Sequence, residues 1–69
     1  MQLFEYAIIA DAKRDKDGEV TEPAELIVPI TTLMARDAAQ ATMLAARQIP
    51  ETWTSSEKID RVKVAVRPF

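Results

Sequence analysis

The sequence contains no cysteine and no histidine among its 69 residues. Without cysteine there is no disulfide, no thiolate metal ligand and no cysteine nucleophile, and without histidine there is no imidazole ligand and no Ser-His-Asp triad. The hydroxyls of Thr54, Ser55 and Ser56 therefore lack a histidine base, and we interpret them as turn and cap residues. The sequence predicts no catalytic residues, no cofactor and no metal site.

Long hydrophobic runs and a strong charge bias are also missing. No stretch approaches the ~20 apolar residues that a membrane-spanning helix needs, and the N-terminus lacks the basic and apolar regions of a signal peptide. Nine Lys and Arg accompany eleven Asp and Glu, so the chain lacks the positive charge that is typical of nucleic-acid-binding domains. We expect no membrane insertion, no signal-peptide secretion and no dedicated nucleic-acid binding.

The chain is short enough to be one small domain, residues 1–69. A protein near this size buries only about 60% of its unfolded surface, while ordering each residue costs about 1.5 kcal/mol. The core of an isolated copy is therefore expected to be only marginally stable.

Residues 3–10 predict the first strand, because they are rich in aromatic and β-branched side chains. One face of this strand carries Phe4, Tyr6 and Ile8, and the other face is also largely apolar. A strand that is apolar on both faces is typical of the centre of a sheet that is covered on both sides.

Residues 11–25 are charged and contain the only glycine, Gly18, so they predict a solvated hairpin loop that turns at this glycine. The carboxylates around Gly18 do not have the spacing of a calcium loop. Residues 25–35 predict the second strand. Pro29 cannot donate a ladder hydrogen bond, so it places this strand at a sheet edge or on a bulge.

Residues 37–50 predict the one helix. Asp37 is a good N-cap, Gln40 has the spacing of a capping box, and Pro50 is expected to end the helix. The apolar arc of this helix spans about 200°, which is wider than the ~100° stripe that packing on one sheet requires. Either alanine is tolerated on a solvated face because it is the best helix former, or the excess arc contacts a second chain.

Residues 58–69 predict the last strand. Val62, Val64 and Val66 alternate with basic residues, which is typical of a half-buried strand with a basic outer face. The basic side chains either pair with acids across the sheet or bind an anion, and Trp53 either forms an aromatic wall for that anion or plugs the end of the core. The candidate anion contacts are Arg61, Lys63, Arg67 and Trp53.

Together these elements predict an α+β fold with the order β-β-α-β. A hairpin makes the first two strands antiparallel, and a right-handed crossover through the helix returns the last strand parallel to the second. We expect a three-stranded mixed sheet in the order 2-1-3, with the helix on one face and the valines beneath it. The other face of the sheet then stays uncovered.

Uncovered apolar patches usually mark an interface. The predicted interface has three parts: the open sheet face, the outer side of the helix and the C-terminus. Its residues are Leu3, Ala7 and Ile9 on the sheet, Ala39, Met43, Leu44 and Ala46 on the helix, and Pro68 and Phe69 at the end of the chain.

Three segments of the chain resemble short proteins encoded by tailed bacteriophages, some of which lie among virion structural genes. The segments are Phe4-Glu5-Tyr6-Ala7, Ala45-Ala46-Arg47-Gln48-Ile49-Pro50 and Val64-Ala65-Val66-Arg67-Pro68-Phe69, which are about a quarter of the chain. They contain no chemical motif. The resemblance implies a small virion component or assembly accessory, located in the virion or the host cytoplasm, with no catalytic residues.

We therefore expect a non-enzymatic structural or interaction protein that forms a homo-oligomer or docks on a larger capsid, portal or tail protein. The alternative is a small regulator that binds a host protein, or an anionic ligand such as a nucleotide or nucleic acid, through the basic face of the last strand. An enzyme is the third possibility, but most carboxylates crowd one loop and no rigid acid-base pair is indicated.

Overall fold

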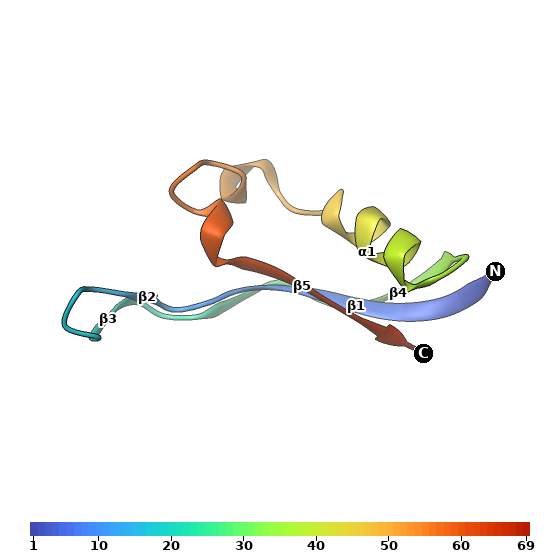
Figure 1. The fold of residues 1–69 in the computed structure, drawn as a ribbon, viewed down its shortest axis with the longest axis horizontal. Coiled ribbons are helices and arrows are strands. Elements are labelled where there is room, and N and C mark those ends of the chain that lie inside the picture. Colours follow the sequence, from blue (N-terminus) through green and yellow to red (C-terminus); the bar gives the residue numbers. More distant parts are fainter.

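A computed structural model describes all 69 residues and shows one helix packed on a three-stranded sheet (Figure 1). The strands are β1 (Gln2–Ala10), β2 (Lys13–Arg14), β3 (Val20–Glu22), β4 (Glu25–Ala35) and β5 (Val62–Pro68), the helix is α1 (Ala38–Ala46), and two 3-10 turns are η1 (Glu51–Trp53) and η2 (Ile59–Arg61). The predicted small α+β domain is confirmed.

The sheet has the order β4-β1-β5, which confirms the predicted order 2-1-3. Both outer strands are antiparallel to β1, so no two neighbouring strands are parallel. The sheet is therefore antiparallel, and the prediction that it is mixed was wrong. The helical crossover does make β5 run in the same direction as β4, but β1 lies between them.

The strands β2 and β3 prolong the hairpin of β1 and β4 beyond the sheet as a narrow arm (Figure 1). The arm turns at Gly18, whose φ of 84° is a left-handed conformation that favours glycine. Asp15 closes the turn, because its Oδ1 accepts hydrogen bonds from the backbone N–H groups of Asp17 and Glu19. This arm gives the molecule its elongated shape, 45 × 20 × 17 Å.

The edge strand β4 is bulged where it passes Pro29. Tyr6 pairs with Thr31 but Ile8 pairs with Val28, so β4 contains one more residue than β1 in this interval. Pro29 lies inside the bulge and on an edge strand, as its missing N–H requires. The sequence prediction for this strand is confirmed, including its bounds.

The helix α1 begins where the sequence predicts and ends earlier. The Asp37 carboxylate accepts from the Gln40 N–H at 2.8 Å, while the Gln40 side chain accepts from the Arg36 N–H and not from that of the cap residue. The last helical residue is Ala46, not Ile49. The N–H groups of Gln48 and Ile49 bond to carbonyls three residues back, so a tighter turn replaces the helix before Pro50 is reached.

The strand β5 begins four residues later than predicted. β1 ends at Ala10, which pairs with Val62, so no strand residue remains to pair with residues 58–61. These residues form the 3-10 turn η2 instead, in which the Arg61 N–H bonds to the Lys58 carbonyl. Arg61 is therefore not part of the basic row on the last strand.

The core lies between α1 and one face of the sheet. Phe4, Tyr6 and Ile8 of β1 are buried against Ala41 and Ala45 of the helix. The three valines of β5 pack around them half-buried, as predicted. Only seven residues are buried in the whole chain, so the core is small.

Ala41 and Ala45 form the side of the helix that faces the sheet, whereas Ala38 and Thr42 are exposed. Leu44 packs beside Phe4 and Ala41 and is the only large apolar residue within the helix that contacts the core.

Candidate functional site: the uncovered face of the sheet

The face of the sheet opposite the helix has no element packed on it. Figure 1 shows α1, η1 and η2 on one side of the three strands and nothing on the other. Alternation along β1 places Leu3, Ala7 and Ile9 on this open face, while Phe4 and Ile8 point to the core. The structure therefore brings together the three sheet residues that the sequence predicts at an interface.

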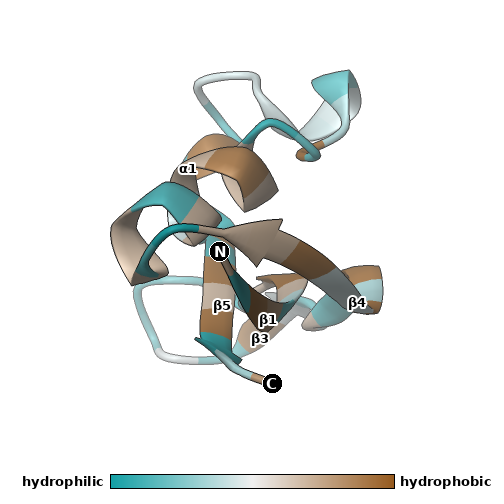
Figure 2. Ribbon diagram, turned by 90° about the vertical axis from the view of Figure 1, so that its right-hand side faces the viewer, coloured by the Kyte–Doolittle hydropathy of each residue, from teal (hydrophilic) through white to brown (hydrophobic).

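The edge strand β4 adds apolar side chains to the open face that are more exposed than those of β1. Met34 pairs with Leu3 and Leu26 pairs with Ile9, so these cross-strand neighbours point to the same side of the sheet. Ile30, from the bulge, projects between them. Five apolar side chains on this face are 36–63% exposed: Leu3, Ile9, Leu26, Ile30 and Met34. Figure 2 shows hydrophobic residues along all three strands.

Sequence reasoning missed the contribution of β4. Plain alternation places Ile30 on the same face as Met34, but the irregular register between Thr31 and Leu26 means that the side to which Leu26 points cannot be counted from the sequence. The position of Met34 could have been predicted from the sequence. In a hairpin of these two strands Met34 pairs with Leu3, and paired residues point to the same face of the sheet.

A hollow of about 190 Å³ lies in the middle of the open face. Ala7 and Ala65 lie directly opposite each other on β1 and β5, and their short side chains leave this space open. Ile30 lines one side of the hollow, and Glu5 and Arg67 line another. The open face thus presents a protruding isoleucine next to an apolar depression.

The charged residues of the open face are already paired. The Arg67 Nε donates to the Glu5 carboxylate at 2.9 Å, and the Lys63 Nζ lies 2.8 Å from the Asp11 carboxylate. These pairs follow the predicted alternative in which the basic row answers acids across the sheet. The face consequently carries no net charge.

The pairing with Asp11 also raises the pKa of Lys63 above 10.5, first through the hydrogen bond and then through charge attraction. A raised lysine pKa means that the folded chain holds the proton more tightly than the unfolded chain. Any stabilisation from this pair is therefore present below pH 10.5 and is lost as the pH rises through the raised pKa.

The predicted helix residues form a second surface on the opposite side of the molecule. Ala39, Met43 and Ala46 are exposed there, whereas Leu44 is half-buried against the core. Leu44 therefore offers less surface to a partner than Met43 does.

The C-terminal residues lie at the end of the open face nearest the start of β1. Pro68 pairs with Phe4, and the Phe69 N–H donates to the Leu3 carbonyl at 3.0 Å. The backbone is held in place, but the Phe69 side chain is exposed.

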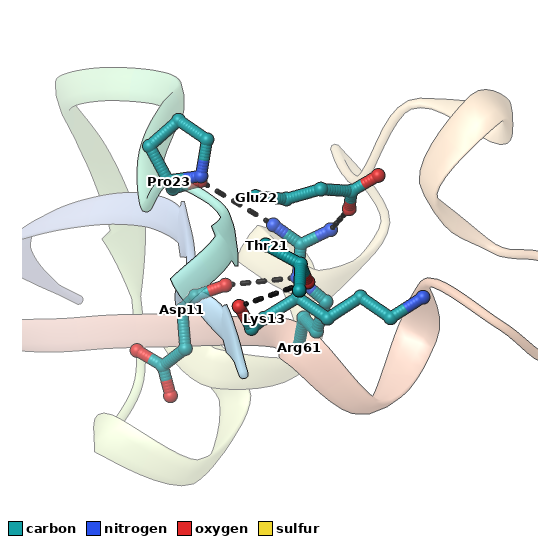
Figure 3. Close-up of polar contacts among 6 residues, drawn as sticks. All are labelled: Asp11, Lys13, Thr21, Glu22, Pro23 and Arg61. Carbon is teal, nitrogen blue, oxygen red and sulfur yellow. Dashed lines mark hydrogen bonds and ion pairs between the residues drawn. The ribbon is translucent and has the colours of Figure 1, made fainter. Parts of the chain in front are cut away.

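Arg61 has a different position from the other basic candidates, since it ties the arm to the rest of the molecule. Its guanidinium donates to the carbonyls of Asp11 and Pro23 and to the Glu22 carboxylate, the last at 2.6 Å (Figure 3). Trp53 lies against this guanidinium, with the ring centroid 5.5 Å from the Arg61 Cζ and 5.4 Å from the Lys58 Nζ. Trp53 contacts neither core cluster, so it does not plug the core.

The four candidate anion contacts do not form one site. Arg61 and Trp53 line a shallow hollow beside the arm, which also contains the carboxylates of Glu22 and Glu25. Lys63 and Arg67 lie on β5, and each holds an acid of its own. An incoming anion would have to displace a carboxylate at each of the three basic side chains.

No group of three potential metal ligands is present, and no helix has the length and apolar character needed to span a membrane. Comparisons with known proteins give no match, neither to a family model nor to a curated protein nor to a solved structure. The open face is therefore the main candidate for a functional surface.

Proposed function

We propose that the protein is a non-enzymatic structural or interaction protein whose open sheet face is covered by another protein surface. The observation that carries this proposal is the group of five partly exposed apolar side chains on one face of the central sheet. Exposed patches of contiguous apolar side chains on small soluble domains mark interaction sites.

The surface area of the chain supports this proposal. Its accessible surface is 4994 Å², whereas a compact monomer of 7.7 kDa exposes about 4,300 Å². The excess reflects the projecting arm and the bare sheet face.

The energetic gain from covering the face is comparable with the cost of association. Fully burying one such side chain contributes about 1.5–3 kcal/mol, so covering five half-exposed ones contributes about 4–7 kcal/mol per chain. Association costs an estimated ~4–15 kcal/mol in lost freedom. The two quantities are of similar size, so a complex through this face should be weak and sensitive to concentration.

The setting that we propose is a tailed bacteriophage, as a virion component or an assembly accessory. Support comes from the resemblance of three segments to short phage proteins and from the small size of the core, which suits a subunit that completes itself in an assembly. A regulator that binds an anionic ligand is the weaker proposal, because all three basic candidates are paired with acids.

Mass spectrometry of particles tests this function. In a phage whose genome encodes the chain, we expect its peptides in purified virions, or in purified heads, tails or assembly intermediates, at a ratio to known structural proteins that survives repeated gradient purification. Loss of the peptides in parallel with host contaminants at every purification step would overturn the virion role.

A further inference from the structure

We propose that the occupant of the open face is a second copy of this chain, and that Ile30 of each copy inserts into the hollow above Ala7 and Ala65 of the other. This inference rests on the proposed function and names its partner. The shape, charge and area of the open face support it.

The open face is complementary to itself in shape. A two-fold interface requires that one surface contain both a protrusion and the depression that receives it, since each residue i that meets j is repeated as j meeting i. Ile30 is 63% exposed and borders the hollow directly. A two-fold axis that passes between Ile30 and the hollow therefore places the isoleucine of each copy over the hollow of the other.

The size of the hollow suits this side chain. Its volume of about 190 Å³ exceeds the ~150 Å³ in which a cavity lined by apolar groups holds a benzene molecule. The floor is formed by the two alanines, which are opposite neighbours on β1 and β5. A branched four-carbon side chain fits this space, whose lining is mostly apolar.

Charge does not oppose the pairing of two identical faces. The ionic side chains on the face are the pairs Glu5–Arg67 and Asp11–Lys63, each consisting of one acid and one base. The net charge of the whole chain is only −2, so two copies repel each other weakly. A highly charged partner would gain no electrostatic attraction from this face, because its charged side chains are already paired.

The area predicts a dimer of moderate affinity. Nine residues of β1 and three strands give a face of about 30 by 14 Å. Such a footprint belongs to the smaller specific interfaces, below about 1,200 Å² in total. We expect a dimer that dissociates on dilution through the micromolar range.

The test measures molar mass by light scattering over a range of concentrations, with three single substitutions. Ile30→Asp removes the protrusion, Ala65→Leu fills the hollow, and Met43→Asp is the matched control, because Met43 is also 63% exposed but lies on the helix. Circular dichroism and thermal melting of each variant establish that it is folded.

We expect the dissociation constant to rise at least tenfold for Ile30→Asp and for Ala65→Leu, and to stay within twofold for Met43→Asp. Ala65→Leu is the sharpest variant, since general hydrophobic adhesion predicts tighter association when an apolar group is added. A further single variant, Ile30→Ala, completes a double-mutant cycle with Ala65→Leu. The double variant Ile30→Ala with Ala65→Leu should associate more tightly than these two single effects together imply, because the new side chain occupies the space that Ile30 leaves.

Three outcomes would overturn the inference. These are a monomer at all concentrations up to about the millimolar range, tighter association of Ala65→Leu, and a dimer broken only by Met43→Asp. The first leaves the proposed function to be decided by the particle experiment, and the last assigns association to the helix surface instead. Failure of the dimer and failure of the virion role are thus separate results.

Discussion

At the scale of single residues, Arg61 is the side chain on which most separate segments depend. One guanidinium joins the end of β1 at Asp11, the arm at Glu22 and Pro23, and Trp53 before the last strand. Its side chain is only 12% exposed, in contrast to 69% for Arg67. Planar geometry explains why arginine is needed here, since five donors in a fixed fork can reach several acceptors at once.

Replacing Arg61 with methionine should lower the free energy of unfolding by about 1–3 kcal/mol, because hydrogen bonds from a charged group contribute about 1.5–3 kcal/mol and water replaces them only in part. Urea denaturation followed by circular dichroism measures this loss. The matched control is Arg67→Met, an exposed pair for which we expect less than about 1 kcal/mol.

Both Arg61 and Arg67 variants are best measured in the Ile30→Asp background, so that association does not contribute to the result. Equal losses for the two arginines would contradict the assignment of Arg61 as the clamp of the arm.

At the scale of elements, the helix is short and depends on its first turn. It has nine residues, its buried face consists of Ala41 and Ala45, and three of its exposed residues are also alanine. A helix of this length is marginal alone, so the cap and the packing of Leu44 carry much of its stability.

Asp37→Ala should therefore destabilise the fold by about 1 kcal/mol, within the ~0.5–2 kcal/mol range of N-cap replacements, because the Gln40 N–H loses its acceptor. Asp37→Asn keeps an acceptor oxygen and should lose less than half as much. Thermal unfolding at fixed concentration compares the two variants, and an asparagine variant as unstable as the alanine one would show that the cap hydrogen bond is not the cause.

At the scale of the whole molecule, the chain encloses a small core and leaves half of its sheet surface bare. The radius of gyration is 13.6 Å, compared with about 11 Å for a compact chain of 69 residues. An extended shape with few buried residues gives a small net stability for the isolated chain.

The stability of the protein should consequently depend on its concentration. Covering the open face stabilises the folded chain by mass action, so the melting temperature should rise by several degrees between about 5 and 500 µM protein. Calorimetry at both concentrations measures this shift, and Ile30→Asp should abolish it. A shift of the same size in that variant would show that another surface is responsible.

The sequence by itself determined the order of elements, the order of the strands and the two-sided character of β1. These features depend on local signals: alternation in β1 and β5, the glycine at the turn, and the caps and prolines around the helix. A hairpin and a central strand leave few allowed topologies, so these signals were sufficient to predict the strand order. Alternation along β1 then placed Leu3, Ala7 and Ile9 on one face.

Only the tertiary structure decided which residues complete that face. The two register irregularities of β4 turn Val28 to the core and return Leu26 to the open side opposite Ile9. The early end of β1 converts residues 58–61 into a turn that directs Arg61 to the arm. The hollow exists because Ala7 and Ala65 become opposite neighbours in the register of two distant strands. Pairing of this kind depends on how the whole chain packs, whereas periodicity reports only which side of its own strand a residue occupies.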